Sequence, residues 1–336
     1  MKAIVLHEIG EPEKLRYEDV PDPKPEKGEA VVQLHAAALN RRDVWIRTGK
    51  YAGIKLPIIL GSDGAGEVAA VGSEEDASWI GKSVVINPTL EWGNDPRAQS
   101  SSFRILGLPD NGTYAQRVKI PVKNIFPKPK ALSFEEAATI PLASVTAYRA
   151  VVTRGQVQSG ETVLVTGIGG GVALAALQIA KSLGAKVIVT SGNDEKLERA
   201  QTFGAHGGVN YHAEDWGDKI HSLAGNAGVD VVIDSVGGEM FNRGIDLLKP
   251  GGRFVSYGST TGNVGNLILR RIFWKQLTVL GSTMGTPEDF SAMLQLYERK
   301  AIQPVIDSII PLEHANEAHR KMEQANQFGK IVLKIG

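Results

Sequence analysis

The amino-acid sequence predicts an α/β protein with two domains, a small mostly β domain and a second domain built on a doubly wound parallel sheet. The chain has 336 residues, which is long enough for two domains with separate cores. Residues 1–127 contain short β-type runs bounded by glycine, proline or charged residues. From residue 162 onward, apolar strand-like runs alternate with helical stretches, a pattern typical of right-handed βαβ crossovers in a parallel sheet.

The β-type runs of the first half are expected to be strands of the small domain. The clearest candidates are residues 3–6, 30–34, 66–71 and 83–86. Residues 21–25 read Pro-Asp-Pro-Lys-Pro, and prolines this close together suit neither a helix nor a central strand. We therefore expect a loop there.

The second half begins at a predicted helix start, Ser133-x-x-Glu136, which has the form of a capping box. Gly184 and Gly204 are expected to end the helices that follow the first two strands. The predicted strands are residues 163–166, 187–190, 229–233, 253–257, 277–280 and 331–335. Beyond the helix that ends at Gly184, the predicted helices are residues 196–203, 240–248, 286–300 and 312–324.

Composition excludes several classes of function. The chain has 37 Lys and Arg against 37 Asp and Glu, so it lacks the basic field that nucleic-acid or membrane-surface binding needs. It has no cysteine, which excludes disulfides, thiolate metal sites and thiol nucleophiles. Residues 162–180 carry no charge, but glycines interrupt them, and the N-terminus does not resemble a signal peptide. We expect a cytoplasmic protein with no nucleic-acid or membrane partner.

Residues 162–173 read Thr-Val-Leu-Val-Thr-Gly-Ile-Gly-Gly-Gly-Val-Ala, a strand, a glycine-rich turn and the start of a helix. Glycines let the backbone approach a pyrophosphate closely, and the first amides of a helix bind such an anion. The spacing Gly167-x-x-Gly170-x-x-Ala173 is a variant of the dinucleotide-binding fingerprint. The residues predicted to hold a nicotinamide dinucleotide here are Gly167, Gly169, Gly170, Gly171 and Val172.

The end of the second strand indicates which dinucleotide is bound. NAD enzymes usually place Asp or Glu there for the adenosine ribose hydroxyls, whereas this strand continues as Thr190-Ser191-Gly192 with no acid until Asp194. A carboxylate would repel a 2′-phosphate, while Ser191, Gly192 and Lys196 would accept or bind it. The sequence therefore favours NADPH over NADH.

Further motifs occur in order along the whole chain. They are Leu39-Asn-Arg-Arg-Asp43, Pro57-x-x-x-Gly61-x-Asp-x-x-Gly66, Gly112-Thr-Tyr-Ala115, Pro141-Leu-Ala, Asp234-x-Val-Gly-Gly238, Gly251-Gly-Arg and Gly329-Lys-Ile-Val-Leu333. Together they resemble the medium-chain dehydrogenase/reductase superfamily. The resemblance implies a GroES-like catalytic domain over 1–127 and 286–336, and a Rossmann domain over 128–285. It also implies a homodimer joined edge to edge through residues 277–280.

The superfamily divides into zinc-using and zinc-free members. Where zinc-using members have ligands, this chain has Asn40, Asp43, Asp63 and Ala143 with Ser144. Zinc binds thiolate, imidazole or carboxylate, so only the two aspartates qualify, and both are equally explicable as structural residues. We expect no metal. The resemblance then narrows to the zinc-free quinone oxidoreductases and the alkenal or enone reductases.

In that branch, NADPH passes hydride to a quinone or to the β-carbon of a conjugated carbonyl, whose electron-poor π-system takes up the charge. The resemblance thus implies an NADPH-dependent reductase of a small-molecule quinone or α,β-unsaturated carbonyl. Two alternatives remain open. One is an alcohol dehydrogenase of the same superfamily, and the other is an NADPH-binding sensor with vestigial activity.

Individual roles follow from the resemblance. Asn40 matches a position beside the nicotinamide and the substrate, although a turn-forming Asn before a helix explains it equally well. Tyr51, in preference to Arg42, is the candidate donor to a substrate oxygen. Thr146 resembles a threonine at the nicotinamide end. The other implied cofactor-binding residues are Tyr211 near the adenosine phosphate, Ser235, Tyr257, Gly258 and Lys330 near the C-terminus.

The remaining polar and aromatic residues have structural explanations. Asp43 is expected to cap a helix or to pair with Arg47. His314 and His319 form no metal-binding pattern and are expected at the surface. Trp45, Trp92 and Trp274 are candidates to line the active-site cleft, but the default expectation for them is the buried core.

Overall fold

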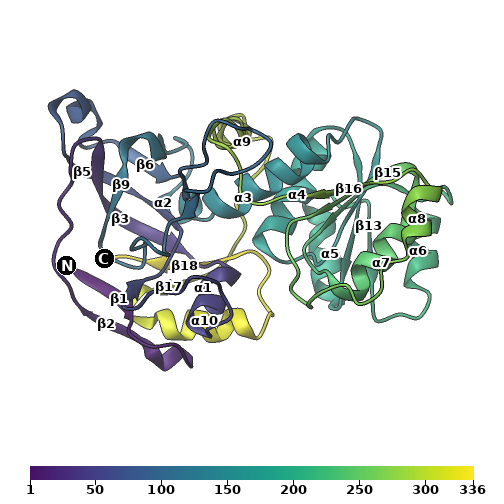
Figure 1. The fold of residues 1–336 in the computed structure, drawn as a ribbon, viewed down its shortest axis with the longest axis horizontal. Helices are drawn as coiled ribbons and strands as arrows, with labels where there is room; N and C mark the ends of the chain where they lie inside the picture. The colour runs from purple at the N-terminus through teal and green to yellow at the C-terminus, as the bar shows by residue number, and fades with distance from the viewer. The chain divides into compact units, whose positions relative to one another are not determined.

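The computed structural model describes residues 1–336 and confirms the predicted α/β class (Figure 1). The chain divides into two compact units. The first comprises Met1–Ala143, Thr286–Leu294 and Pro304–Gly336, and the second comprises Ser144–Gly285 and Gln295–Gln303.

The second unit contains the predicted doubly wound parallel sheet. Its strand order is β13-β12-β11-β14-β15-β16, and every neighbouring pair is parallel. The strands are β11 (Thr162–Val165), β12 (Lys186–Ser191), β13 (Gly207–Asn210), β14 (Val229–Asp234), β15 (Leu248–Ser256) and β16 (Thr278–Gly281). The connecting helices are α4 (Gly171–Ser182), α5 (Asp194–Thr202), α6 (Trp216–Leu223), α7 (Gly238–Leu247) and α8 (Leu269–Trp274). The order reverses at β11 and β14, where sheets of this kind bind dinucleotides.

Burial explains why these segments form strands. The residues of β11 are all buried, as expected for a central parallel strand covered on both faces. Leu164, Ile188 and Val232 lie in one hydrophobic cluster with Phe254. The edge strand β16 differs, since Val279 is 41% exposed. The helix stops were predicted correctly, because Gly184 and Gly204 lie just beyond α4 and α5 with positive φ.

The first unit is built mainly on antiparallel strands. Its larger sheet has the order β10-β6-β5-β3-β18-β17 with β9 also paired to β3, and a smaller sheet has the order β2-β1-β4. The longer strands are β1 (Lys2–Leu6), β2 (Leu15–Asp19), β3 (Glu29–Ala38), β5 (Asp63–Val71), β6 (Ser83–Ile86), β9 (Arg117–Pro121), β17 (Ile306–Pro311) and β18 (Lys330–Lys334). The short strands are β4 (Ile58–Ile59), β7 (Thr89–Leu90), β8 (Arg104–Ile105) and β10 (Ile125–Pro127). The helices are α1 (Arg41–Arg47), α2 (Phe134–Ala138), α3 (Pro141–Tyr148), α9 (Pro287–Glu298) and α10 (Ala315–Glu323), of which α3 and α9 cross into the second unit.

The C-terminal segment completes this sheet. Strand β18, drawn in yellow in Figure 1, pairs antiparallel with β3, with Val332 opposite Ala38. The chain's last strand therefore brings Lys330 next to Asn40, which lies two residues beyond the end of β3. The first unit also extends past the predicted boundary at residue 127, because α2 packs on β3, β5 and β18.

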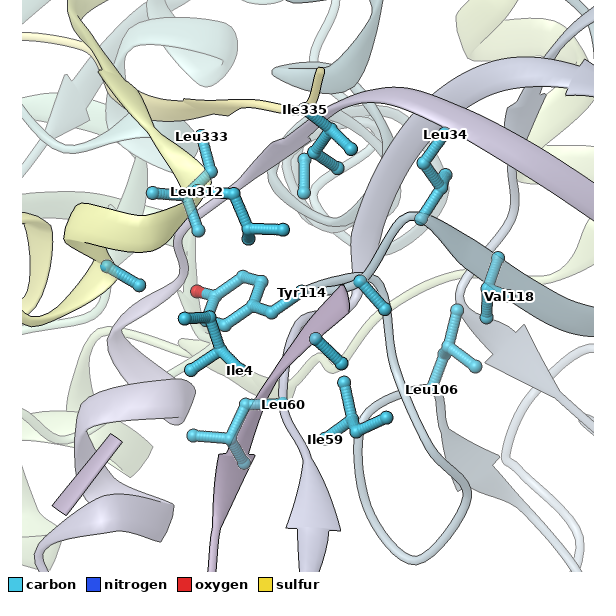
Figure 2. Close-up of a cluster of buried hydrophobic side chains, with 14 of the residues drawn as sticks. Ile4, Leu34, Ile59, Leu60, Leu106, Tyr114, Val118, Leu312, Leu333 and Ile335 are labelled. Carbon is cyan, nitrogen blue, oxygen red and sulfur yellow. The ribbon is translucent and has the colours of Figure 1, made fainter. Parts of the chain in front are cut away.

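The core of the first unit surrounds Tyr114. Figure 2 shows this ring among Ile4, Leu60, Leu312 and Leu333, side chains from distant parts of the sequence. Gly61 lies against the ring with a φ of +98°, and a β-carbon placed there would come within 2.4 Å of Tyr114. Only glycine fits this approach.

None of the helices combines the length and the apolar character needed to cross a bilayer. Between α3 and β11 the chain forms one π-helical segment, Arg149–Arg154, which the sequence pattern did not predict.

Candidate functional site

The glycine turn of the second unit joins β11 to α4. Gly167 and Gly169 have φ values of +67° and +115°, backbone conformations that residues with a β-carbon rarely adopt. Gly170 is the N-cap of α4 and has no side-chain cap, and a β-carbon added there would meet nothing within 4 Å. The first amides of this 12-residue helix, at Gly171 and Val172, therefore begin at an open, uncapped end. Such an end fits the pyrophosphate of a dinucleotide.

A buried carboxylate organises the neighbouring switch point. Asp234, at the end of β14, accepts hydrogen bonds from Thr166 Oγ1 at 2.6 Å, Gly237 N at 3.0 Å and Val236 N at 3.2 Å. Burial raises the pKa of Asp234, while these hydrogen bonds oppose the shift. The contacts tie the end of β11 to the turn after β14. The motif Asp234-x-Val-Gly-Gly238 does not by itself reveal this role of Asp234.

The residues predicted for the adenosine end meet at the carboxyl ends of β12 and β13. Ser191 is buried, and its carbonyl accepts from Tyr211 N at 3.1 Å. Gly192 lies against the Tyr211 hydroxyl. Lys196 lies in the first turn of α5, where its backbone N–H donates to the Asn193 side chain at 3.1 Å. The structure thus brings Ser191, Gly192 and Tyr211 together, with Lys196 on the adjoining helix.

Ser235, Tyr257 and Gly258 also lie together, at the carboxyl ends of β14 and β15. Tyr257 N donates to the Asp234 carbonyl at 2.9 Å, and a β-carbon on Gly258 would come within 3.3 Å of the Ser235 side chain. Burial raises the pKa of Tyr257, and a hydrogen bond with Ser235 opposes that rise. Thr146 is a buried residue of α3 whose hydroxyl lies 3.9 Å from the sulfur of Met284.

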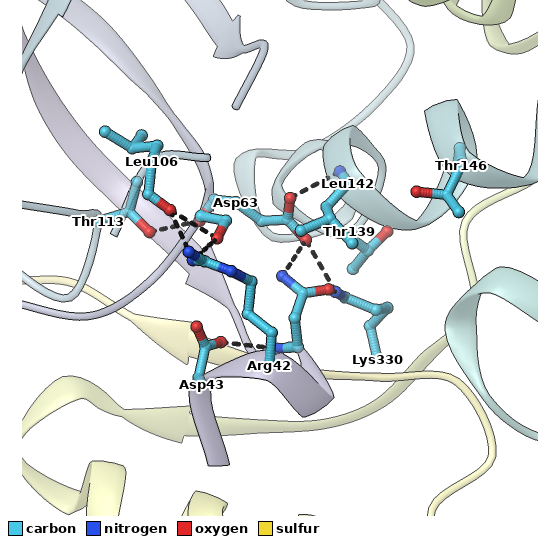
Figure 3. A network of polar contacts seen from close by, with 12 residues as sticks. Arg42, Asp43, Asp63, Leu106, Thr113, Thr139, Leu142, Thr146 and Lys330 are labelled. Atoms are coloured by element: carbon cyan, nitrogen blue, oxygen red, sulfur yellow. Dashed lines mark hydrogen bonds and ion pairs between the residues drawn. The ribbon is translucent and has the colours of Figure 1, made fainter. Parts of the chain in front are cut away.

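In the first unit, Lys330 and Asp63, both labelled in Figure 3, form a buried polar cluster with Asn40. The Lys330 ammonium donates to Asn40 Oδ1 at 2.6 Å and to Asp63 Oδ2 at 2.8 Å. Asn40 Nδ2 donates to the same Asp63 oxygen at 3.0 Å. Asp63 Oδ1 accepts from Leu142 N at 2.7 Å. Two predicted site residues, Asn40 and Lys330, are therefore joined by Asp63, for which the sequence predicts no catalytic or cofactor-binding role.

Arg42 binds the backbone of residues 105–108. Its guanidinium donates to Ser62 Oγ and the Leu106 carbonyl, both at 3.0 Å, and to the carbonyls of Ile105 and Leu108 at 3.4 Å. These four acceptors bind its terminal N–H groups, whereas its buried Nε has no hydrogen-bond partner. Tyr51 is half-buried, with its ring 5.0 Å from the Arg42 guanidinium.

Asp43 acts as expected in capping α1. Its Oδ2 accepts from Asn40 N at 2.8 Å and from the Tyr114 hydroxyl at 2.9 Å. Burial raises the pKa of Asp43, against the opposing effect of the Arg42 cation. Arg47 does not pair with Asp43, and instead bonds Glu323 and the carbonyl of Gly10. No three His, Cys, Asp or Glu side chains lie close enough together to hold a metal ion.

Two sequence predictions were wrong. His319 is completely buried, because its helix α10 packs against α1, and its Nδ1 accepts from Arg47 Nε at 3.3 Å. Its neighbour along the chain, His314, is exposed as predicted. Trp274 is 78% exposed at the end of the short helix α8. Apolar character alone predicted a core position there.

Comparison with known proteins places the chain among dehydrogenases. Residues 26–130 match the family model of the alcohol dehydrogenase GroES-like domain, and residues 171–299 match that of the zinc-binding dehydrogenase. Human quinone oxidoreductase is 32% identical over 344 residues, covering 100% of this chain and 98% of the relative. The acryloyl-coenzyme A reductase of Sulfurisphaera tokodaii is 32% identical over 342 residues, covering 99% and 100%. A solved NAD-dependent alcohol dehydrogenase is 43% identical with a TM-score of 0.95, covering 100% of both chains.

Proposed function

Because the chain belongs to the medium-chain dehydrogenase/reductase superfamily, in its quinone oxidoreductase-like branch, we propose that it is a metal-independent, NADPH-dependent reductase of quinones or α,β-unsaturated carbonyls. The observation that carries this proposal is the Lys330–Asp63 ion pair. A lysine ammonium bonds one of the two carboxylates that qualified as zinc ligands.

The polar cluster supports metal independence. Both oxygens of Asp63 already accept hydrogen bonds, from Lys330, Asn40 and Leu142 N. A metal ion bound there would have to displace a buried cation. Ser144, at the third ligand place, shares a hydrogen bond of 2.8 Å with the Tyr297 hydroxyl, and neutral hydroxyls are not among the usual zinc ligands.

The cofactor assignment rests on the second unit. The uncapped helix end at Gly170 would hold the pyrophosphate, with Gly167, Gly169, Gly171 and Val172 forming the rest of the turn. The remaining residues proposed to contact the cofactor are Thr146, Ser191, Gly192, Lys196, Tyr211, Ser235, Tyr257, Gly258 and Lys330. When bound, NADPH supplies the hydride.

The chain's own contribution to chemistry is proposed to be hydrogen bonding to the substrate oxygen. An electron-poor π-system needs only modest donors as charge develops on that oxygen. Tyr51 is the proposed donor. Asn40 is proposed to lie beside the nicotinamide, where Lys330 and Asp63 fix its amide, since each end of that amide already has a partner. Thr146 is proposed at the nicotinamide end.

An alcohol dehydrogenase activity is the second candidate. The NAD-dependent alcohol dehydrogenase that is 43% identical over the whole chain favours it. This candidate requires oxidation of alcohols and allows a preference for NADH. We further propose a homodimer formed through the exposed edge of β16.

The test is an activity panel on protein purified without added zinc. Quinones, enals, enones, aldehydes and alcohols are each assayed with NADPH and with NADH, and metal content is measured by mass spectrometry. Reduction of quinones or enones with NADPH, unaffected by a chelator, is expected. Stoichiometric zinc with alcohol oxidation would favour the second candidate, and NADPH binding without turnover of any substrate would contradict both.

A further inference from the structure

We propose that His212 is a specificity-determining residue that binds the 2′-phosphate of NADPH, together with Tyr211 and over the open backbone of Gly192. The inference rests on the proposed function only in its choice of cofactor. His212 follows directly after a residue predicted for the adenosine end, but its imidazole had no assigned role.

Strand register places these residues at one edge of the sheet. Strands β12 and β13 are parallel neighbours, and Ser191 lies opposite Asn210. Tyr211 N then donates to the Ser191 carbonyl at 3.1 Å, so the chain after β13 continues alongside the chain after β12. Carboxyl ends of parallel strands form the edge at which such sheets bind their ligands. His212 therefore lies at the edge where the adenosine end is proposed to bind.

Two polar atoms converge on Gly192. A β-carbon placed on Gly192 would lie 2.7 Å from His212 Nε2 and 2.7 Å from the Tyr211 hydroxyl. The two rings contact each other edge to face, with centroids 4.7 Å apart. The only hydrogen bond of His212 is through its backbone N–H, to Asn210 Oδ1 at 3.0 Å, so its imidazole has no partner within the protein. The hydroxyl of Tyr211 is likewise without one. Both groups are thus available to an external acceptor.

The glycine is what makes this arrangement possible. Any side chain at position 192 would displace the imidazole or the phenol ring. An acidic side chain, which an NAD enzyme would place near this point, would likewise have to displace one of these two rings. The nearest acid along the chain, Asp194, accepts a hydrogen bond from Asn210 Nδ2 at 2.8 Å. Asn210 thereby binds the Asp194 carboxylate with one end of its amide and the His212 backbone with the other.

These contacts favour a phosphate over a hydroxyl. A phosphate monoester offers several charged acceptor oxygens, and hydrogen bonds to charged acceptors are roughly twice as strong as neutral ones. His212 and Tyr211 both have a donor to offer, and Lys196 on the adjoining α5 adds a cation. NADH has only a ribose hydroxyl at this position. The imidazole should therefore contribute to NADPH binding and very little to NADH binding.

The test measures dissociation constants without turnover. NADPH, NADH and adenosine 2′,5′-bisphosphate are titrated into the wild type, His212→Ala, His212→Arg and the control His206→Ala. His206 is an exposed histidine just before β13, at the opposite end of that strand. Loss of a charge-assisted hydrogen bond should weaken NADPH and bisphosphate binding about tenfold in His212→Ala, with NADH unchanged. Arginine, which binds phosphate, should restore NADPH binding.

The outcomes separate this inference from the proposed function. If the wild type prefers NADPH and His212→Ala keeps the same ratio of NADPH to NADH affinity, the role of His212 is overturned and the proposed function stands. If the wild type binds NADH as tightly as NADPH, the proposed cofactor fails and the role of His212 fails with it. Equal losses for both cofactors would indicate a structural effect and would also overturn the inference.

Discussion

Acid should destabilise this protein through a single buried histidine. His319 has no exposed surface, its Nδ1 accepts from Arg47, and its Nε2 has no hydrogen-bond partner. Burial, and then the Arg47 cation, lower the pKa of His319 to about 3. The folded state thus holds this imidazole neutral.

The sign and size of the effect follow from linkage. In the unfolded chain the imidazole takes up a proton below a pKa of about 6.5, whereas in the folded chain it stays neutral down to about 3. Its contribution to stability is present above pH 6.5 and is lost as the pH falls from there toward 3. Between pH 7 and pH 5 the loss is about 2 kcal/mol. Any folded pKa below about 4 gives the same result at pH 5, because the folded imidazole is then still neutral.

The assay compares urea unfolding of the wild type and His319→Asn at pH 7, 6 and 5. The Asn carbonyl oxygen can accept from Arg47 in place of Nδ1 but does not titrate. The free energy of unfolding of the wild type minus that of His319→Asn should fall by about 2 kcal/mol between pH 7 and pH 5. His314→Asn, at the exposed histidine, should follow the wild type. A difference that stays constant over this range would show that His319 titrates alike in the folded and unfolded chains, and would refute the reasoning.

Three other outcomes are expected. Gly61→Ala should lower the free energy of unfolding by roughly 1–3 kcal/mol more than Gly81→Ala. Both glycines have positive φ, but only at Gly61 would a β-carbon meet a buried tyrosine ring. Equal losses for the two variants in urea unfolding would contradict this. Lys330→Met should lower the free energy of unfolding by about 3–5 kcal/mol, because it leaves Asp63 buried without its cation. Adding Asp63→Asn to this variant should recover part of the loss. A loss below about 1 kcal/mol for Lys330→Met alone would argue against the ion pair. Val279→Lys on the edge of β16 should convert the proposed dimer to a monomer in light scattering, and a monomeric wild type would end that proposal.

The sheet of the second unit could be predicted from the sequence because its signals are local. Runs such as 163–165 and 187–189 are apolar and β-branched, and each is followed by a helical stretch with glycine just after its end. The glycine turn was equally readable, since a strand, a positive-φ turn and a helix N-terminus are contiguous in the chain. Elements whose cause lies within a dozen residues can be predicted in this way.

Side-chain environments set by distant contacts could not be predicted. Lys330 and Asn40 are 290 residues apart in sequence, and Arg47 and His319 are 272 apart. A surface position is predicted for His319 because it forms no metal-binding pattern with His314, and no local pattern reveals that α1 packs over its helix. At Trp274 the prediction fails in the other direction, because a buried side chain is expected and the structure has an exposed one. A large apolar residue predicts burial, but an edge strand and its short helix can leave such a residue for a partner to cover.

The first unit shows how carboxylates can remain buried without a metal. Asp63 is neutralised by a lysine from the last strand, while Asp43 is stabilised by donors from Asn40 and Tyr114. Asn40 contacts both carboxylates, through its side chain to Asp63 and through its backbone to Asp43. Removing one partner of such a network leaves a buried charge with neither solvent nor a counter-charge. The resulting loss of folding free energy is larger than the stabilisation that the intact pair contributes. Asn40 and the residues around it therefore have a structural role, stabilising buried carboxylates, that is independent of catalysis. A loss of activity in an Asn40 variant assigns it a role in chemistry only if the unfolding free energy is unchanged.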